Sequence, residues 1–248
     1  MSSLFSIEYT VNTTYVNANK KLGLYGLMCM LQDAASVHAI KLGFGYEDMK
    51  SSGIFWVLSR QKIIMKRWPD WREKVQIKTW TKPVESFYAY REFQVLADGQ
   101  VIGECSTMWL ILDSNTHRPK KADFLNETVK PHLDDSLNFT AGKVVKPEET
   151  NVDASFLVRN SDIDMNQHVN NTKYAQWVLD SIPFDLHSKF TLKEFEINFL
   201  NESFLGDEIE VSSHRSIAEL NHNLTFMGKR SSDSKSVFLA SMKAEQLS

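Results

Sequence analysis

The sequence contains very little cysteine, with only two in 248 residues. Cys29 and Cys105 both lie in apolar segments, and no Cys-x-x-Cys pair or Cys/His cluster surrounds either of them. A disulfide framework would need more cysteines, and a zinc site would need grouped ligands. We therefore expect no disulfide and no metal centre, and we interpret both cysteines as small buried hydrophobic residues.

The chain also lacks long apolar runs and an excess of positive charge. No stretch approaches the roughly 18 uninterrupted apolar residues of a membrane-spanning helix, and the N-terminal residues MSSLFSIEYT contain no basic segment followed by an apolar one. The net charge of -3 excludes a strongly basic nucleic-acid footprint. The composition predicts a folded cytoplasmic protein that binds neither nucleic acid nor a membrane, and no segment predicts a cofactor.

The sequence predicts the same order of strands and helix in its first and second halves. Helical spacing of apolar residues and alternation in the strands define the elements, and Asp98-Gly99 predicts a hairpin. The first half has a strand at 5–12, a long helix at 22–43, and strands at 54–65, 74–81, 87–96 and 101–112. The second half has a strand at 154–164, a helix at 170–183, and strands at 189–200, 206–217, 219–230 and 235–246.

This repeated order predicts a duplicated α+β domain. One helix per half, followed by antiparallel strands with an apolar face to cover, indicates a sheet curled around that helix. Between the halves, residues 128–150 lose the apolar periodicity and gain two prolines and clustered charge, as linkers do. We therefore predict an N-terminal domain at 1–127, a linker at 128–150 and a C-terminal domain at 151–248.

One segment concentrates polar groups that suit catalysis. In NSDIDMNQHVNNTKYAQWVLDSIP (160–183), Asp164, Asn166 and His168 lie two residues apart, just before the second helix. Alternate side chains of an extended backbone share one side, about 6.5–7 Å apart, so these three can face one site. A carboxylate or imidazole can activate water, and amides at a helix N-terminus can bind an oxyanion, as thioester hydrolysis requires. The same residue types also form turns and helix caps, so spacing alone leaves both interpretations open.

Longer stretches of the sequence resemble a known family. SDIDMNQHVNNTKYAQWVLDSIP resembles the signature of the acyl-acyl carrier protein (acyl-ACP) thioesterases of plant plastids and bacteria. GFGYEDMKSSGIFWVLSRQKIIMKRWPDWREKVQIKTW and GECSTMWLILDSNTHRPKK resemble motifs of that family's first domain, in the same order. The resemblance implies a bacterial member with a tandem double hotdog fold, in which each half is a long helix wrapped by an antiparallel sheet. It also implies hydrolysis of fatty acyl-ACP thioesters to free fatty acid and ACP.

The same resemblance implies that Asp164, Asn166 and His168 are the catalytic residues of the second domain. The family's pattern continues in the next strand with a Glu-Cys pair, and those two positions here hold Asn198 and Phe199. Phe199 has no nucleophilic atom, and neither cysteine lies in the second half. We therefore expect direct hydrolysis rather than a cysteine nucleophile.

Within that interpretation, Asp164 and His168 polarise a water molecule, and Asn166 positions the water or the thioester oxygen. Asn198 supplies a further hydrogen bond, and Glu202, which stands at the place of a family Asp, approaches the site. Attack by Asp164 itself, through an anhydride, remains an open alternative.

The first half has no Asp-x-Asn-x-His before its helix, so we expect it to bind the acyl chain. His38 lies on the apolar stripe of that helix and is interpreted as a core or binding-site histidine rather than a catalyst.

The expected partner is an ACP that carries a phosphopantetheine-linked acyl chain. Because ACP is acidic, a basic surface is expected to meet it. The basic residues near strand ends are Lys62, Lys66, Arg67, Arg118, Lys120 and Lys121. Two alternatives stay open, an acyl-CoA thioesterase and a non-catalytic acyl-binding hotdog protein, and the protein is expected to be a monomer or a homodimer.

Overall fold

The computed structural model describes residues 3–217 and 221–246. The chain divides into two compact units, Met1–Ala141 and Gly142–Ser248. The division falls within the segment that the sequence suggests as a linker.

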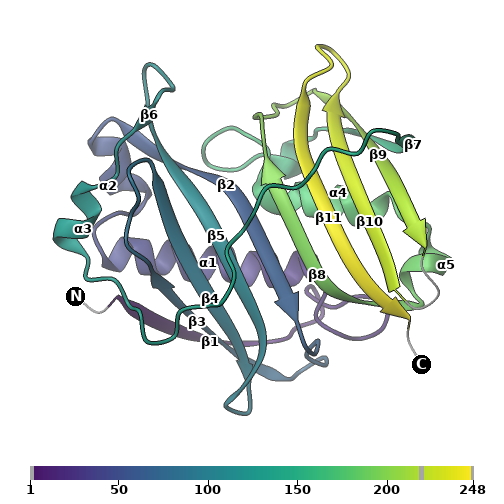
Figure 1. The fold of residues 1–248 in the computed structure, drawn as a ribbon, viewed down its shortest axis with the longest axis horizontal. Helices are drawn as coiled ribbons and strands as arrows, with labels where there is room; N and C mark the ends of the chain where they lie inside the picture. The colour runs from purple at the N-terminus through teal and green to yellow at the C-terminus, as the bar shows by residue number, and fades with distance from the viewer. Residues whose placement is uncertain (1–2, 218–220, 247–248) are drawn as a thin grey trace. The chain divides into compact units, whose positions relative to one another are not determined.

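The first unit is a helix packed on an antiparallel sheet. Helix α1 (Leu24–Lys41) lies across one face of the strands in Figure 1 and buries its leucines and methionines there. The strand order is β1-β3-β4-β5-β2, with the short β6 added beside β5. The strands are β1 (Leu4–Thr10), β2 (Ile54–Met65), β3 (Lys74–Thr81), β4 (Tyr88–Ala97), β5 (Gln100–Asp113) and β6 (Pro119–Lys120). Two short helices complete the unit, α2 (Tyr46–Ser51) and α3 (Phe124–Thr128).

The second unit repeats this plan with shorter helices. A 3-10 turn (Asn160–Asp162), helix α4 (Asn171–Asp180) and helix α5 (Phe184–His187) stand between its first two strands. The strand order is β7-β9-β10-β11-β8. The strands are β7 (Asn151–Leu157), β8 (Phe190–Phe199), β9 (Glu208–Ile217), β10 (Asn221–Arg230) and β11 (Ser236–Gln246). Aromatic side chains of α4 pack on rings from β7, β8 and β11.

The two units share one topology. In each, the first strand pairs with the third, and the second strand pairs with the fifth. This confirms the duplication that the repeated element order predicts, and it confirms the α+β class with a helix against an antiparallel sheet in each half.

Local signals fix several element ends. Asp98 and Gly99 both have positive φ angles, 49° and 74°, as the predicted hairpin between β4 and β5 requires. Gly43 (φ 78°) follows the end of α1, where a left-handed residue commonly stops a helix. The strand expected at 154–164 ends early, at Leu157, because Asp162 accepts the backbone N–H of Arg159 and closes a turn. The strand expected from 219 begins within residues outside the described ranges.

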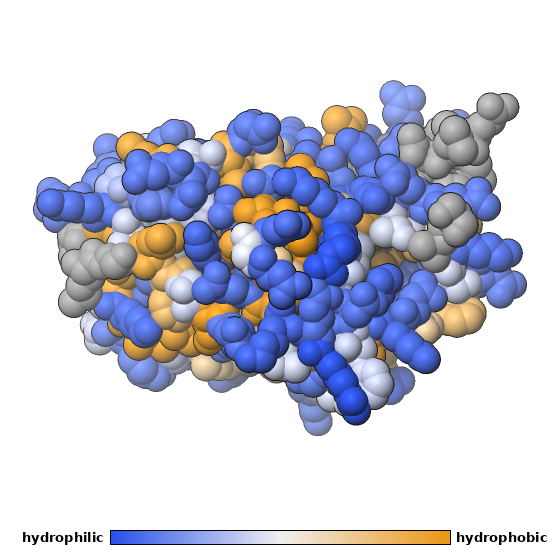
Figure 2. Space-filling model, turned by 90° about the horizontal axis from the view of Figure 1, so that it is seen from below, coloured by the Kyte–Doolittle hydropathy of each residue, from blue (hydrophilic) through white to orange (hydrophobic). Residues whose placement is uncertain are grey.

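Apolar side chains fill the interior of each unit, and polar residues cover most of the face shown in Figure 2, with hydrophobic groups between them. Cys105 is buried as expected, whereas Cys29 is only half-buried, and neither of the two forms a disulfide. His38 is buried, in line with the interpretation as a core histidine. No helix within the described ranges is both long and apolar enough to pass through a bilayer.

The six basic residues expected to form one docking surface do not lie together. Lys66 and Arg67 follow the end of β2, whereas β6, with Lys120, pairs with the part of β5 that faces the start of β2. Twelve strand residues separate these two ends, which is roughly 35–40 Å of extended chain. Arg67 and Lys120 are also engaged locally, in ion pairs with Glu73 (2.6 Å) and Asp113 (2.9 Å).

Candidate active site

Residues 164–168 form a closed turn rather than an extended segment. The Oδ1 atom of Asp164 accepts the backbone N–H groups of Asn166 (2.8 Å) and His168 (3.4 Å). The N–H of Asp164 donates to the carbonyl of His168 at 2.8 Å, and Gln167 takes a left-handed conformation with φ 66°. The expectation that alternate side chains face one side is therefore wrong here, because the aspartate captures the backbone N–H groups that follow it.

The three motif residues differ in how deeply they are buried. Asp164 and His168 stand together at its base and are half-buried, while Asn166 lies at its exposed tip. Met165, also at the tip, has 71% of its surface exposed. Asn166 can therefore reach a bound molecule from outside, while the carboxylate of Asp164 is engaged with the backbone of the turn.

Glu202 joins His168 from the loop that follows β8. Its Oε1 atom lies 3.5 Å from Nδ1 of His168, and the ring of Phe204 meets the imidazole edge-on at 5.1 Å between centroids. The backbone N–H of Val169 donates to the carbonyl of Ser203 at 2.9 Å and fastens the turn to this loop. The predicted approach of Glu202 to the site is thus present in the structure.

Asn198 is placed elsewhere. Its side chain is buried in β8, where Oδ1 accepts the N–H of Val144 (2.8 Å) and Nδ2 donates to the carbonyl of Gly142 (2.9 Å). These bonds hold the start of the second unit against β8. The structure therefore brings Asp164, His168 and Glu202 together and leaves Asn198 in a packing contact.

The N-terminus of α4 is already capped. Asn170 is the N-cap, and its Oδ1 accepts the N–H of Thr172 at 3.0 Å. The N–H of Lys173 donates to the carbonyl of Asn170. Two of the amides that the sequence suggests for an oxyanion are therefore occupied, which leaves the side-chain amide of Asn166 as a candidate donor.

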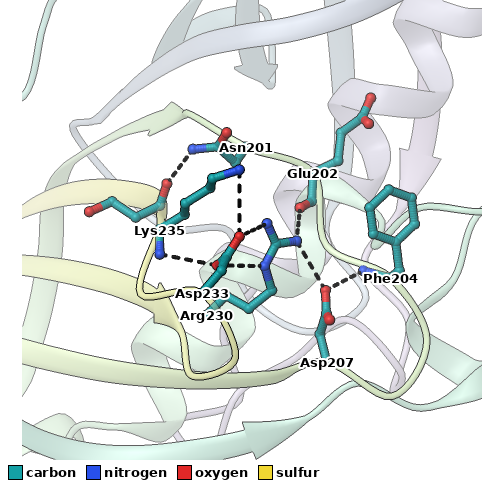
Figure 3. Close-up of polar contacts among 8 residues, drawn as sticks. Asn201, Glu202, Phe204, Asp207, Arg230, Asp233 and Lys235 are labelled. Atoms are coloured by element: carbon teal, nitrogen blue, oxygen red, sulfur yellow. Dashed lines mark hydrogen bonds and ion pairs between the residues drawn. The ribbon is translucent and has the colours of Figure 1, made fainter.

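A half-buried arginine supports the loop that carries Glu202. Arg230, at the end of β10, donates from Nη1 to the backbone carbonyl of Glu202 (3.0 Å) and to the carboxylate of Asp207 (3.3 Å), as Figure 3 shows. Asp207 also accepts the N–H of Phe204 at 2.9 Å. On its other edge Arg230 holds Asp233 through two bonds of 3.0 and 2.9 Å, and these lower the pKa of Asp233 to about 2. In Figure 3 the Glu202 side chain points away from this network. The arginine therefore holds the backbone of Glu202 without engaging its carboxylate.

The first unit contains the same turn without the acidic and imidazole side chains. Asn17 Oδ1 accepts the N–H groups of Asn19 (3.0 Å) and Lys21 (3.2 Å), and the N–H of Asn17 donates to the carbonyl of Lys21 at 2.8 Å. Lys20 is left-handed (φ 58°), as Gln167 is. NANKK (17–21) thus matches DMNQH (164–168) bond for bond, and an amide is sufficient to close this turn.

The anchoring of the two turns matches as well. The N–H of Leu22 donates to the carbonyl of Pro69, as that of Val169 does to Ser203, so Trp68 stands where Glu202 stands. Lys21 occupies the place of His168 and pairs with Asp70 at 2.8 Å. The first unit therefore lacks an imidazole at this place.

An aromatic residue, Phe199, occupies the position at which the family pattern has a cysteine. Phe199 packs against the ring of Tyr174, and burial raises the pKa of Cys105, in the first unit, to about 12. The described part of the chain contains no group of three or more His, Cys, Asp or Glu side chains that could hold a metal ion.

Sequence reasoning missed Arg230 and Phe204. Arg230 lies 28 residues beyond Glu202 and meets it only through the pairing of β strands, so no local signal indicates it. The alignment with the family motif placed Glu202, but nothing in that motif predicts an aromatic ring on His168.

Comparison with known proteins covers both units. The family model for the acyl-ACP thioesterase N-terminal domain matches residues 2–131, and that for the C-terminal domain matches residues 145–239. The chain is 23% identical over 222 residues to a dodecanoyl-[acyl-carrier-protein] hydrolase of Cinnamomum camphora, and 27% identical over 224 residues to oleoyl-acyl carrier protein thioesterase 2 of Arabidopsis thaliana. These alignments cover 84% and 82% of the chain but only 58% and 60% of the two curated relatives.

Solved structures agree over the full length. An acyl-ACP thioesterase of Bacteroides thetaiotaomicron superposes with a TM-score of 0.88 at 26% identity and covers 98% of both chains. The 12:0-ACP thioesterase of Umbellularia californica has a TM-score of 0.86 at 19% identity, covering 100% of this chain and 99% of that one, which supports the shared hotdog fold. With both of its domains matched in order, the chain belongs to the acyl-ACP thioesterase family.

Proposed function

We propose that the protein hydrolyses fatty acyl-ACP thioesters to free fatty acid and ACP. Family membership over both units supports the reaction class, and the pairing of His168 with Glu202 in the turn that carries the family's Asp, Asn and His is the observation that carries it. In this chain Glu202 takes the carboxylate role that the family pattern gives to the position of Asn198.

The mechanism follows from the contacts of the turn. Glu202 orients the imidazole through Nδ1, so that Nε2 of His168 removes a proton from a water molecule. The hydroxide attacks the thioester carbon, and the side-chain amide of Asn166 donates to the oxyanion. When the carbon–sulfur bond breaks, the imidazolium returns the proton to the leaving thiolate, which gives a carboxylic acid and the free thiol.

The other assignments remain predictions of the sequence. We propose that the first unit, 1–127 in the sequence division, binds the acyl chain and that the second, from 151, carries the reaction. We also propose that the partner is an ACP that bears phosphopantetheine. The proposed location is cytoplasmic, and the proposed state is a monomer or a homodimer.

Matched substrates test the function directly. The purified protein is given dodecanoyl-ACP and dodecanoyl-CoA at equal concentration, and the released thiol is measured over time. Faster release from the ACP ester supports the proposal, and a panel of other chain lengths then defines the preferred acyl group. Faster release from CoA favours the acyl-CoA alternative, while binding without release favours a non-catalytic acyl-binding protein.

The contribution of the Asp164 charge to catalysis can be tested by a substitution that keeps the turn. Because Asn17 closes the same turn in the first unit, Asp164→Asn should keep the turn and change the free energy of unfolding by less than about 0.5 kcal/mol. Loss of the negative charge beside His168 should lower kcat by about 10–100-fold, because the imidazolium formed during reaction is less stabilised. Steady-state kinetics and urea unfolding measure both quantities. A loss of kcat to the background rate with the fold intact would instead support attack by Asp164 itself.

Arg230 is expected to support catalysis through the backbone of Glu202. Arg230→Met removes its bonds to the Glu202 carbonyl and the Asp207 carboxylate, and we expect kcat to fall by about tenfold or more while the protein loses about 1–3 kcal/mol of stability. Arg230→Lys, which can make only one of these contacts at a time, should give an intermediate kcat.

Asp233→Asn is the matched control for Arg230. It weakens the other edge of the same network, away from Glu202, so it should lower stability with little change in kcat. Equal effects of Arg230→Met and Asp233→Asn on kcat would show that the network matters only for folding.

A further inference from the structure

Arg91 lies in the interior of the first unit, on the face of the sheet that α1 covers. Only 8% of its surface is exposed. Its Nη1 atom is 2.8 Å from Nδ1 of His38 in α1 and donates to Thr79 Oγ1 at 3.1 Å. A guanidinium group can only donate, so Nδ1 of His38 accepts, and His38 is the neutral tautomer with its proton on Nε2. The positive charge of this cluster therefore belongs to Arg91 alone.

No carboxylate among the described residues pairs with Arg91. Glu92 is the next residue, but alternation along β4 turns it to the other face, where it accepts from Trp80 (3.1 Å) and pairs with Lys82 (3.0 Å). Burial lowers the pKa of Arg91 to about 10. The two side-chain hydrogen bonds of its guanidinium group both come from Nη1. Burial of a guanidinium charge without a carboxylate is costly, and the two neutral acceptors, His38 and Thr79, offset only part of that cost.

The residues beside Arg91 continue a polar row across the sheet. Arg91 pairs with Thr107 of β5, and Thr107 pairs with Gln61 of β2. Thr107 and Gln61 have only 2% and 4% of their surfaces exposed. A helix-covered sheet face is normally apolar, so this row departs from the rule.

The second unit shows that the fold does not need these polar residues. Gln61 and Phe195 occupy equivalent positions in the two units. Each lies twelve residues before an acidic residue, Glu73 or Asp207, whose backbone carbonyl accepts the N–H of the residue just after the first strand of its unit. From Phe195 the same register runs to Met242 of β11 and to Leu224 of β10.

The polar row of the first unit, Gln61-Thr107-Arg91, is therefore Phe195-Met242-Leu224 in the second. These three apolar residues are all 5% exposed or less. The same topology is therefore compatible with an apolar row at this place, so packing does not explain why the first unit has a charged residue there.

We propose that Arg91, with Thr79 and the neutral His38 beside it, is a binding site for a carboxylate group inside the first unit. Two sources of that group are compatible with an acyl-ACP thioesterase, namely the free fatty acid that the reaction releases and a second carboxylate at the far end of the acyl chain. The choice between these sources rests on the proposed function. The binding itself does not, and it can be measured in the absence of turnover.

Binding of dodecanoate is compared with binding of dodecanol, which has the same chain and no charge, by titration calorimetry. The wild-type protein should bind dodecanoate about tenfold more tightly than dodecanol, as expected for a charge-assisted pair of hydrogen bonds in a dry site. Arg91→Leu introduces the residue type that the second unit has at the equivalent position, Leu224. This variant should lose the preference for dodecanoate. Arg60→Leu, a half-buried arginine of β2, is the matched control and should retain it.

The stability of Arg91→Leu separates a ligand site from a packing role. Without ligand, the variant should melt at the same temperature as the wild type or higher, since an unpaired buried charge has been removed. If Arg91→Leu does not fold, Arg91→Lys carries the test, because it keeps the charge but loses the planar fork and should reduce the preference for dodecanoate severalfold. An unchanged preference in the variant that folds overturns the proposal.

A kinetic comparison then identifies the source of the carboxylate. Thioesters of dodecanoic acid and of dodecanedioic acid are hydrolysed side by side by wild type and Arg91→Leu. A preference for the diacid ester that disappears in Arg91→Leu assigns the site to the far end of the chain. Equal rates, together with tight dodecanoate binding that inhibits turnover, assign it to the released acid. Absence of hydrolysis with both esters would count against the proposed function and leave the calorimetric result intact.

Discussion

Replacing His168 by alanine is expected to lower kcat by about 10²–10⁴-fold without unfolding the protein. The general base of the proposed reaction is lost, while the Asp164 carboxylate still accepts the backbone N–H groups that close the turn. Glu202→Gln should reproduce a large part of this loss, since its carboxylate lies 3.5 Å from the imidazole and orients it. Both effects should appear in kcat rather than in KM, because neither group is assigned to the acyl chain.

The double variant gives the sharper result. Two residues that act as one unit are non-additive, so His168→Ala with Glu202→Gln should be no slower than His168→Ala alone. Glu194→Gln, which removes a carboxylate of the same unit from a surface pair with Lys243, serves as the control and should leave kcat near the wild-type value. Multiplicative losses in the double variant would mean that Glu202 does not work through His168.

The second large effect concerns the core that supports α4. Phe238 of β11 is fully buried, and its ring lies 5.6 Å from that of Tyr174. Phe238→Ala should lower the free energy of unfolding by about 3–5 kcal/mol, because the cavity left behind cannot close. Urea denaturation followed by circular dichroism measures this loss.

Gly228 provides the matched test for that ring. It pairs with Phe238 across β10 and β11, and a Cβ atom at Gly228 would overlap with the phenylalanine ring. Gly228→Ala alone should therefore cost about 1–3 kcal/mol through overpacking. In the Phe238→Ala background the space is open, so the same change should be nearly neutral, and additive losses would contradict the packing described.

The sequence predicts the fold well where signals are local. The stripe of α1, the Asp98-Gly99 hairpin and the limits of β3 all follow from residues that lie within the element itself. The repeat of element order then indicates two units of one topology, which the strand pairings confirm. Element ends were missed where a side chain closes an unexpected turn, as Asp162 does after β7.

The candidate site was less predictable because its geometry depends on distant segments. Spacing alone suggested an extended Asp-Asn-His row, but Asp164 competes for backbone N–H groups and bends the segment. The family motif led to Glu202 and equally to Asn198, and only the structure separates the loop beside His168 from the contact with Gly142 and Val144. Arg91 gave no signal, because an arginine in a strand is normally exposed.

The matching turns at 17–21 and 164–168 also bear on ancestry. The backbone of the candidate reaction centre exists twice in one chain, with the same bonds and the same left-handed residue. The copies differ in the groups that could react, since Asn17, Lys21 and Trp68 stand where the other half has an aspartate, a histidine and a glutamate. The second turn therefore required no new backbone. Under the proposed function, a few substitutions on a backbone that both halves share made only one of the two copies reactive.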